Sequence, residues 1–398
     1  MATRSKADKQ MKTRPLGKLS QTYAARIKVV GVGGGGGNAV SRMSRNFSVK
    51  NIDFVAINTD AQDLDFCDAK HKIYIGKNLT RGLGTGMNPD IGRQAAEENR
   101  SEIAEILKDA DLVFITAGLG GGTGSGASPV IAEVAKEAGI LTVAVVTRPF
   151  SFEGSNRSRI AQEALIKLKE KVDTLIVVPN DRIFSIIQKD TPLIKAFEYI
   201  DDVLRSAVQG IAEVIAMPGI VNVDFADVRT IMQDAGSALV GIGLANGQDR
   251  AMTAVSQAVN SPLLEVSIEG AKGVLLGISG GRDMKMSEVN DIAKRITEVV
   301  DPAAKIIFGA YHDRNLDKGK LRVTLIATGF NGHSLTGTDA SSASLFTLQP
   351  EPVVSEPLAL EKEESAKKGK ENPLAGKQGK KESSDIWDIP TFLRKKRK

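Results

Sequence analysis

Residues 118–126 read Gly-Leu-Gly-Gly-Gly-Thr-Gly-Ser-Gly, and six of these nine residues are glycine. The stretch follows an apolar segment, residues 112–117, that is typical of a buried strand, and it precedes residues 127–138, whose pattern predicts a helix. Glycine has no Cβ, so its backbone can adopt positive φ and its N–H groups can approach a ligand closely. Because amides at a helix N-terminus bind anions, and Thr123 and Ser125 add hydroxyl donors, the stretch predicts a polyphosphate site rather than a flexible linker.

The composition indicates a globular protein with two ordinary domains and additional tails, because the chain has 398 residues of which 41% are apolar. The single cysteine, Cys67, excludes a disulfide framework and favours a reducing compartment. The N-terminal stretch lacks the apolar core of a secretory signal, and no apolar run reaches the roughly 18 residues of a membrane span. We therefore expect a cytoplasmic protein without a membrane span.

The net charge of +5 is concentrated at the two ends of the chain. Residues 1–26 contain seven Lys or Arg and one acid, and residues 394–398 are all basic, so the part between them is acidic. A nucleic-acid-binding core would have a basic face, and we therefore expect no nucleic-acid partner. The basic ends are either tails that contact only solvent or segments that bind anionic lipid or a partner, and both interpretations stay open.

Five apolar runs alternate with helical patterns, at residues 27–32, 52–57, 112–117, 141–146 and 174–178. Near-continuous apolar strands separated by helices indicate a parallel sheet with both faces covered. The loops that follow these runs read GGGGGN, NTD, GLGGGTGSG, TRPF and PNDR. Because ligands bind at the carboxyl ends of strands in such sheets, we expect all five loops at one edge. The predicted fold class is α/β, with a Rossmann-like parallel sheet in the first domain.

A long helix and a second, α+β domain are expected next. Apolar residues repeat at helical spacing from Leu193 to Val214, with Thr191 as the expected N-cap, Pro192 at the first helical position and Pro218 with Gly219 as the stop. Beyond this helix, we expect strands at 239–244, 273–278, 306–310 and 322–327, and helices near 225–234, 249–259 and 287–299.

These patterns divide the chain into six parts. They are a flexible basic extension (1–26), a nucleotide-binding domain (27–190), the central helix (191–219), the second domain (220–332), a linker (333–384) and a C-terminal peptide (385–398). The linker is rich in Ser, Thr, Pro, Gly, Lys and Glu without periodicity, which predicts disorder. The final peptide has large apolar side chains again, including the only tryptophan, Trp387.

A second glycine stretch, residues 31–37, follows the first apolar run and ends at Asn38. It contains a formal GxGxxG, which is a weak signal for a dinucleotide site. Two glycine-rich phosphate loops suit a triphosphate better than a pyrophosphate bridge. A third glycine-rich turn at 82–86, which includes Thr85, could contact the terminal phosphate. Because of the formal GxGxxG, a dinucleotide-dependent oxidoreductase stays open as the alternative enzyme.

Two pairs of residues at i and i+4 are candidates for base and sugar recognition. Phe197 and Asp201 lie on one face of the central helix, where an aromatic ring could stack on a base and a carboxylate could accept from guanine N1–H and N2–H2. Alternatively, Phe197 belongs to the core and Asp201 is solvated. Glu153 and Arg157 either form a surface ion pair or contact ribose and phosphate.

The motifs together resemble the tubulin/FtsZ family of GTPases over residues 27–332. The resemblance rests on GVGGGGGNAV at 31–40, NTDAQ at 58–62, GGGTGSGASPV at 120–130, VVTRPFSFEG at 145–154, VPND at 178–181 and NVDFADVRTIM at 222–232. It implies a GTPase domain, a central helix and a second, activation domain. The third turn departs from the usual family pattern at Thr85, which affects the expected γ-phosphate contact.

The resemblance also implies which residues bind GTP or GDP. They are Gly34, Gly35, Gly36, Gly37, Asn38, Gly122, Thr123, Gly124, Glu153, Arg157, Asn180, Phe197 and Asp201. It implies no protein-bound metal site, because Mg²⁺ would be held mainly by the phosphates and water.

The acidic motif at 222–227 would supply the catalytic residues, Asn222, Asp224 and Asp227. From the residues alone, Asp224 could equally be the N-cap of the following helix, with Asp227 as its capping-box partner. By resemblance, Asp224 and Asp227 would polarise the attacking water on the GTP of the next subunit. Hydrolysis would then be completed in trans, and the chain would polymerise head to tail into filaments of the cytokinetic (Z) ring at mid-cell.

The C-terminal peptide, 385–398, resembles the family's partner-binding tail. Its apolar anchors are Ile389, Phe392 and Leu393, and the expected partners are membrane-tethering division proteins of the FtsA, ZipA or SepF type. Two rivals to a filament-forming GTPase stay open at this point: the dinucleotide-dependent oxidoreductase, and a nucleotide-binding scaffold that does not hydrolyse its ligand.

Overall fold

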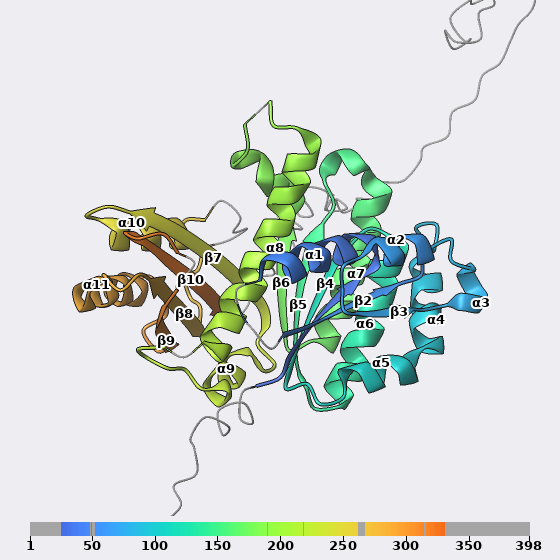
Figure 1. Cartoon of the computed structure of the whole chain (residues 1–398), viewed down its shortest axis with the longest axis horizontal. Coiled ribbons are helices and arrows are strands. Elements are labelled where there is room, and N and C mark those ends of the chain that lie inside the picture. The colour runs from blue at the N-terminus through green and yellow to red at the C-terminus, as the bar shows by residue number, and fades with distance from the viewer. Residues whose placement is uncertain are drawn as a thin grey trace, which may run out of the picture. The chain divides into compact units, whose positions relative to one another are not determined.

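A ten-stranded sheet organises the part of the chain that the structure describes, which is residues 25–330 without 48, 50, 51, 189, 218, 262–266, 314 and 315. In this computed structural model the strand order is β3-β2-β1-β4-β5-β6-β7-β10-β8-β9 (Figure 1). The predicted linker, the C-terminal peptide and nearly all of the N-terminal extension lie outside the described residues.

The first six strands form the parallel half of the sheet. All five strand pairs in this half are parallel, as the sequence predicts. The strands run as expected, with one or two further residues at most carboxyl ends, and β3 is a strand that the sequence analysis did not predict. The bounds are β1 Ile27–Val32, β2 Ile52–Asn58, β3 His71–Tyr74, β4 Leu112–Gly118, β5 Leu141–Arg148 and β6 Thr174–Pro179.

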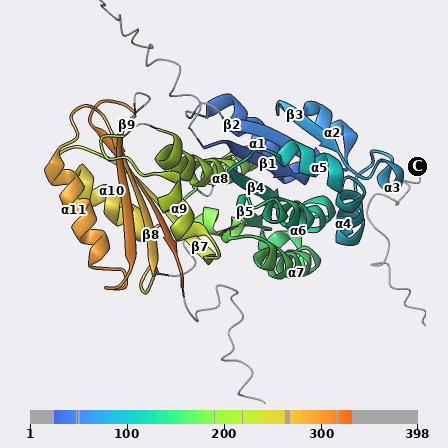
Figure 2. The same cartoon turned by 90° about the horizontal axis from the view of Figure 1, so that it is seen from below.

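Helices cover both faces of this half, which is why its strands are almost continuously apolar. Residues of one face, such as Val29, pack against α1 and the central helix α8, whereas those of the other face, such as Val30, pack against α4, α5, α6 and α7. Figure 2 shows α6 and α7 on one side of β4 and β5, and α8 on the opposite side. The bounds are α1 Gly33–Asn46, α2 Ala61–Phe66, α3 Lys77–Thr80, α4 Pro89–Glu98, α5 Arg100–Leu107, α6 Gly122–Glu137 and α7 Ser155–Lys171, with short 3₁₀ segments η2 Ser151–Glu153 and η3 Asn180–Ser185.

Two of these helices begin inside the glycine stretches rather than after them. Helix α1 begins at Gly33, and α6 begins at Gly122 instead of residue 127. The sequence pattern underestimated α6 and gave no bounds for α1, because glycine disfavours a helix interior. Close packing between elements overrides that preference: a Cβ on Gly36 would lie 2.4 Å from the carbonyl oxygen of Thr116 in β4, which leaves room for no other residue.

The central helix α8 (Leu193–Ala216) lies between the two halves of the sheet. Its start differs from the prediction, because Pro192 is the N-cap residue and no side chain caps the helix. Thr191 is therefore not the N-cap, and Pro192 is not the first helical residue. Buried residues of α8 such as Val208 and Ile211 join one core with strands of both halves.

The second half of the sheet is mixed. Strand β10 pairs antiparallel with β7 and β8, while β8 and β9 are parallel. Helices α10 and α11 cover one face, and their apolar residues form a separate core. Only three residue pairs, from Thr174 with Gly236 to Ile176 with Ala238, join β6 to β7. The bounds are α9 Phe225–Met232, β7 Gly236–Asn246, α10 Arg250–Val259, β8 Gly273–Gly280, α11 Met286–Thr297, β9 Lys305–His312 and β10 Lys320–Thr328. None of the described helices is both long and apolar enough to cross a membrane.

Candidate nucleotide-binding pocket

A pocket of about 290 Å³ lies at the carboxyl ends of β1, β4, β5 and β6, beside the first turns of α8. It brings together most of the residues expected to bind nucleotide: Gly34, Gly35, Gly122, Thr123, Gly124, Glu153, Arg157, Asn180, Phe197 and Asp201. Gly36, Gly37 and Asn38 lie outside its lining. The alternation of strands and loops therefore located this edge of the sheet correctly.

Glycine is required where the two glycine-rich stretches pack against each other and against the turn at 82–86. Gly33 has φ 70°, and a Cβ placed on it would lie 2.9 Å from the backbone nitrogen of Gly124. A Cβ on Gly122 would lie 2.1 Å from Thr85 Oγ1. Because both helices begin at this contact, their free N–H groups converge on one wall of the pocket, where they can bind anionic oxygens.

Hydroxyl groups complete this wall. Thr123 lies 2.7 Å (Oγ1 to Oγ1) from Thr59 and 3.5 Å from Thr85, and Thr85 also lines the pocket. Ser125, expected as a further donor to the ligand, instead accepts a hydrogen bond from Gly120 N–H at 2.9 Å and is buried away from the lining. Its role is to hold the loop, because a buried hydroxyl must find a partner within the protein.

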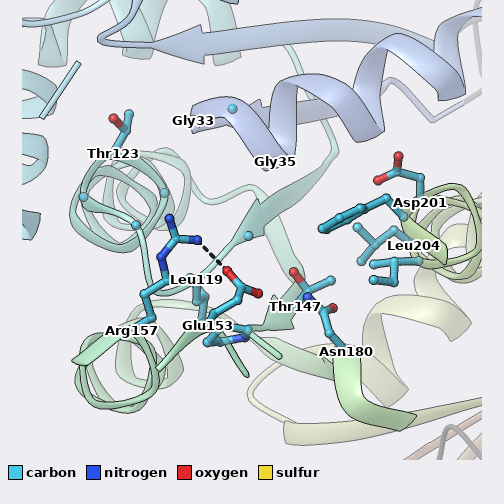
Figure 3. Close-up of a pocket in the computed structure, with 18 of the residues that line it drawn as sticks. Gly33, Gly35, Leu119, Thr123, Thr147, Glu153, Arg157, Asn180, Asp201 and Leu204 are labelled. Atoms are coloured by element: carbon cyan, nitrogen blue, oxygen red, sulfur yellow. Dashed lines mark hydrogen bonds and ion pairs between the residues drawn. The ribbon is translucent and has the colours of Figure 1, made fainter. Parts of the chain in front are cut away.

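The Glu153 and Arg157 side chains form an ion pair within the lining (Figure 3). Glu153 also accepts from Phe150 N–H at 2.9 Å, which fixes the carboxylate at the rim. The pair therefore belongs to the pocket and is not an isolated surface pair.

Asn180, at the start of η3, has an unusual side chain. It is 7% exposed and lines the pocket, yet its Oδ1 has no hydrogen-bond partner. Among the buried side-chain atoms of the described residues, one other, Thr116 Oγ1, shares this condition. A buried acceptor without a partner costs about 1–3 kcal/mol, and a donor from a bound ligand would remove that cost.

The first turns of α8 form the opposite wall. Phe197 is 44% exposed and contacts the buried ring of Phe150 edge-on, with centroids 5.8 Å apart, so it is not a core residue. Asp201 lies in the lining and pairs with Arg42 of α1, with Nε 2.9 Å from Oδ2. Burial raises the pKa of Asp201 to about 6, against the opposing effect of Arg42.

The three expected catalytic residues lie away from this pocket, at the other end of α8 (Figure 1). A helix of 24 residues is about 36 Å long, so these side chains cannot reach the pocket of their own chain. Asp224 Oδ1 accepts from Asp227 N–H at 2.8 Å and is the N-cap of α9, as the structural alternative predicts, whereas no reciprocal hydrogen bond from the Asp227 side chain completes a capping box at this described helix start. The carboxylates of Asp224 and Asp227 are nevertheless exposed, and Asn222 accepts from Gly219 N–H at 2.6 Å.

Sequence reasoning missed several residues of the lining. Thr147 and Pro149 belong to the TRPF loop, which was recognised as a loop at the ligand edge but not assigned contacts. Ile200 and Leu204 follow Phe197 at helical spacing, which would have placed them on the same face. Gly33, Leu119 and Gly121 also line the pocket, and they belong to the glycine-rich stretches at 31–37 and 118–126 that the sequence identified. Arg42, which lies outside the lining, had no signal in the sequence, because its contact with Asp201 joins two helices far apart in the chain.

The fold and the pocket define an α/β nucleotide-binding protein in which two glycine-rich helix starts meet at one wall of the pocket. Family comparison refines this class. Residues 26–188 match the Tubulin/FtsZ family GTPase domain, and residues 236–331 match the FtsZ family C-terminal domain.

Solved structures agree with the family match. An empty FtsZ dimer from M. jannaschii is 48% identical, with a TM-score of 0.74 over 78% of this chain and 90% of that chain. CetZ1 from Haloferax volcanii, a GDP-bound monomer, is 21% identical with a TM-score of 0.68 over 77% and 95%, and shares the fold. The chain belongs to the FtsZ family, and it is a GTPase. This result decides against the dinucleotide-dependent oxidoreductase and the scaffold that does not hydrolyse its ligand.

Proposed function

We propose that this GTPase polymerises head to tail into filaments that form the cytokinetic ring at the division site in the cytoplasm, with hydrolysis completed in trans. One observation carries the proposal: the pocket and the exposed acids of the 222–227 segment lie at opposite ends of α8. A chain stacked on a second copy in the same orientation would bring Asp227 of one copy to the pocket of the other.

Exposed apolar side chains at both ends of α8 support this arrangement. Phe152, Phe184 and Ile194 are 66%, 55% and 72% exposed near the pocket, and Ile220 is 75% exposed at the other end. Isolated exposed apolar residues are ordinary, but the group of three near the pocket, with Ile220 at the opposite end, favours burial between copies. Similar proteins were solved as an FtsZ dimer and as a CetZ2 protofilament with GTPγS.

The pocket residues have distinct roles in this proposal. The N–H groups at the starts of α1 and α6 and the Thr123 hydroxyl bind the phosphates, and Glu153 with Arg157 contacts ribose and phosphate. Phe197 stacks on the base, Asp201 accepts from guanine, and Asn180 Oδ1 accepts from the ligand. Mg²⁺ would be held mainly by phosphate and water, where it would offset negative charge.

The chemistry at the γ-phosphate depends mainly on position and charge. An Asp227 carboxylate from the neighbour would orient the attacking water, and the Asp224 Oδ2 atom, which does not cap α9, would assist it. Because effective catalysis requires the reacting groups within about 3–3.5 Å, hydrolysis would be slow until a neighbour supplies them.

The experiment compares Asp227→Ala with Asp291→Ala, which removes an exposed acid from α11 and serves as the matched control. Asp227→Ala should bind GTP with unchanged affinity and release phosphate at least about 100-fold more slowly, whereas the control behaves as wild type. Light scattering with GTP, GDP and ATP, recorded in parallel with phosphate release, measures assembly and hydrolysis together.

Complementation tests the trans arrangement directly. Gly121→Phe should block GTP binding without internal strain, since Gly121 lines the pocket, has φ −90°, and a Cβ there meets nothing within 4 Å. Mixing it with Asp227→Ala should recover hydrolysis, because the blocked subunit still supplies Asp227. No recovery under conditions where the two variants co-assemble would show that the acids act within one chain.

The C-terminal peptide, 385–398, is proposed to bind membrane-tethering division proteins of the FtsA, ZipA or SepF type. Its apolar anchors suit an apolar groove on a partner protein, and its five basic terminal residues suit an acidic surface on that partner. Truncation after Ser384 should leave GTP hydrolysis and assembly unchanged and abolish recruitment to membranes in cells. Loss of hydrolysis on truncation would assign the peptide another role.

A further inference from the structure

We propose that Arg42 is a specificity-determining positioning residue, which acts through Asp201 to keep the pocket selective for guanine over adenine. The inference rests on the proposed role of Asp201 in binding the base. Arg42 does not line the pocket itself, and its effect is exerted through the protonation state of the carboxylate that does.

The two purines require opposite protonation states of a carboxyl group. Guanine presents two donors, N1–H and N2–H2, which an ionised carboxylate accepts with its two oxygens. Adenine presents an acceptor, N1, beside the donor N6–H2, and this pattern matches a neutral carboxyl that donates through its O–H and accepts through its carbonyl oxygen. An Asp at this position is therefore selective for guanine only while it is ionised.

Of the influences on the Asp201 carboxyl, only the charge of Arg42 favours its ionised form. The Asp201 side chain is 15% exposed, and its burial raises its pKa to about 6. Glu198 and Asp202, on the same helix, also raise the pKa, Arg42, on α1, lowers it, and the value of about 6 is the net of all these effects. Across the pocket, the charged side chains are Glu153 and Arg157, which are paired with each other.

The geometry directs the Arg42 charge chiefly to Asp201. Its Nε lies 2.9 Å from Asp201 Oδ2, while its NH1 lies 3.5 Å from Glu198 Oε1. Glu198 has a closer cation in Lys195 Nζ at 2.7 Å. The ion pair with Arg42 is made at Oδ2, so Oδ1 stays available to a base.

Removing the Arg42 charge should therefore shift the pH range in which the pocket prefers guanine. An opposite charge at hydrogen-bond distance lowers the pKa of a carboxyl by about 1–3 units. In Arg42→Gln the midpoint for loss of GTP affinity on acidification should move upward by about one pH unit or more. At pH 7 the variant should bind GTP several-fold more weakly and ATP more tightly, so the GTP-to-ATP preference falls by about tenfold.

The test measures the affinity of the full-length protein for GTP, ATP and ITP from pH 5.5 to 8.5, in wild type, Arg42→Gln, Arg42→Lys and Asp201→Asn. For Arg42→Gln we expect an affinity for GTP that approaches wild type at pH 8.5 and diverges below pH 7.5. Arg42→Lys should lie close to wild type, because it retains the charge. ITP, which lacks the N2 amino group, should bind more weakly than GTP but show the same pH profile.

Three outcomes are distinguishable. A pH profile of Arg42→Gln that superimposes on wild type overturns the proposal. A loss of GTP affinity equal at every pH, with unchanged GTP-to-ATP preference, also overturns it, because that result describes a merely structural contact between α1 and α8. If Asp201→Asn binds GTP as wild type does at every pH, the carboxylate does not contact the base, and it is the proposed function of Asp201 that fails.

Discussion

The two halves of the sheet place their polar side chains in opposite ways. In the parallel half, polar groups at the strand ends open into a pocket, and the Asn180 Oδ1 atom lacks a partner in the protein. In the mixed half, charged side chains are closed into buried networks. Arg322 donates to both oxygens of Glu213, at 3.1 and 2.9 Å, and to Asp313 Oδ2 at 2.9 Å.

The closed network connects the central helix to the mixed half. Glu213, on α8, is 1% exposed and also accepts from the Tyr311 hydroxyl at 3.2 Å. Burial and the neighbouring Glu213 charge raise the pKa of Tyr311. The comparison teaches that polar groups satisfied within the fold serve stability, whereas groups left open at one edge are available for a ligand.

The largest effect is expected from breaking the closed network. Arg322→Met removes a guanidinium from beside the buried carboxylates of Glu213 and Asp313 and should lower the free energy of unfolding by about 3–5 kcal/mol. GTP affinity should stay unchanged under conditions where the variant is folded. Urea unfolding measures the loss, with the exposed Arg295→Met as control. A loss below about 1 kcal/mol would show that the network does not stabilise the fold.

Substitutions in the pocket of the parallel half should instead affect GTP binding. Gly122→Leu places a Cβ within 2.8 Å of the Asn88 backbone and closer to Thr85, so it should weaken GTP binding at least about 100-fold, or about 3 kcal/mol. The helical circular-dichroism signal should remain largely intact. Gly37→Ala is the control, because a Cβ there meets nothing within 4 Å and the residue lies outside the lining. Unchanged affinity in Gly122→Leu would contradict the phosphate-binding assignment.

A substitution of Asp201, in the pocket, should change stability and GTP affinity in opposite directions. The pKa of Asp201 in the folded protein is about 6, above the ordinary value of 3.8, because the fold disfavours the charged carboxylate. The protein is therefore more stable while Asp201 is neutral, below about pH 4, and this stability is lost as the pH rises through 6. Asp201→Asn should therefore stabilise the nucleotide-free protein by about 1–3 kcal/mol at pH 7.5, while it weakens GTP binding. Thermal unfolding at pH 7.5 and 5 should show the gain shrinking on acidification. A gain independent of pH would show that the buried charge of Asp201 is not its cause.

The smallest effects are expected at two i,i+4 ion pairs near the start of α7, of which one joins η2 to α7 and the other lies within α7. Arg157 pairs with Glu153 in the pocket lining, whereas Arg159 pairs with Glu163 on the surface of α7. Arg157→Ala should weaken GTP binding by about tenfold, or about 1.4 kcal/mol. Arg159→Ala should change stability by less than about 0.5 kcal/mol and leave binding unchanged. Equal effects of the two substitutions, in calorimetric titration with GTP, would contradict the placement of Arg157.

Sequence reasoning succeeded where information is local. Every strand except β3 was located to within a few residues at each end, since continuous apolar runs bounded by glycine and polar loops have few alternative structures. Most of the pocket followed from the rule that such loops meet at one sheet edge. The helix starts at Gly33 and Gly122 were missed, because the propensity of glycine opposes a helix and only the contacts with neighbouring backbone explain it.

The sequence by itself determined the parallel α/β architecture, the presence of a long central helix and the glycine-rich stretches that line the pocket, because hydrophobic periodicity and glycine stretches express local physical preferences. Only the tertiary structure decided that Arg42 contacts Asp201, that Arg322 closes a network with Glu213, and that the acids of the 222–227 segment lie far from the pocket. These relations join residues distant in the chain, and their energies depend on burial and on distances that no local pattern specifies.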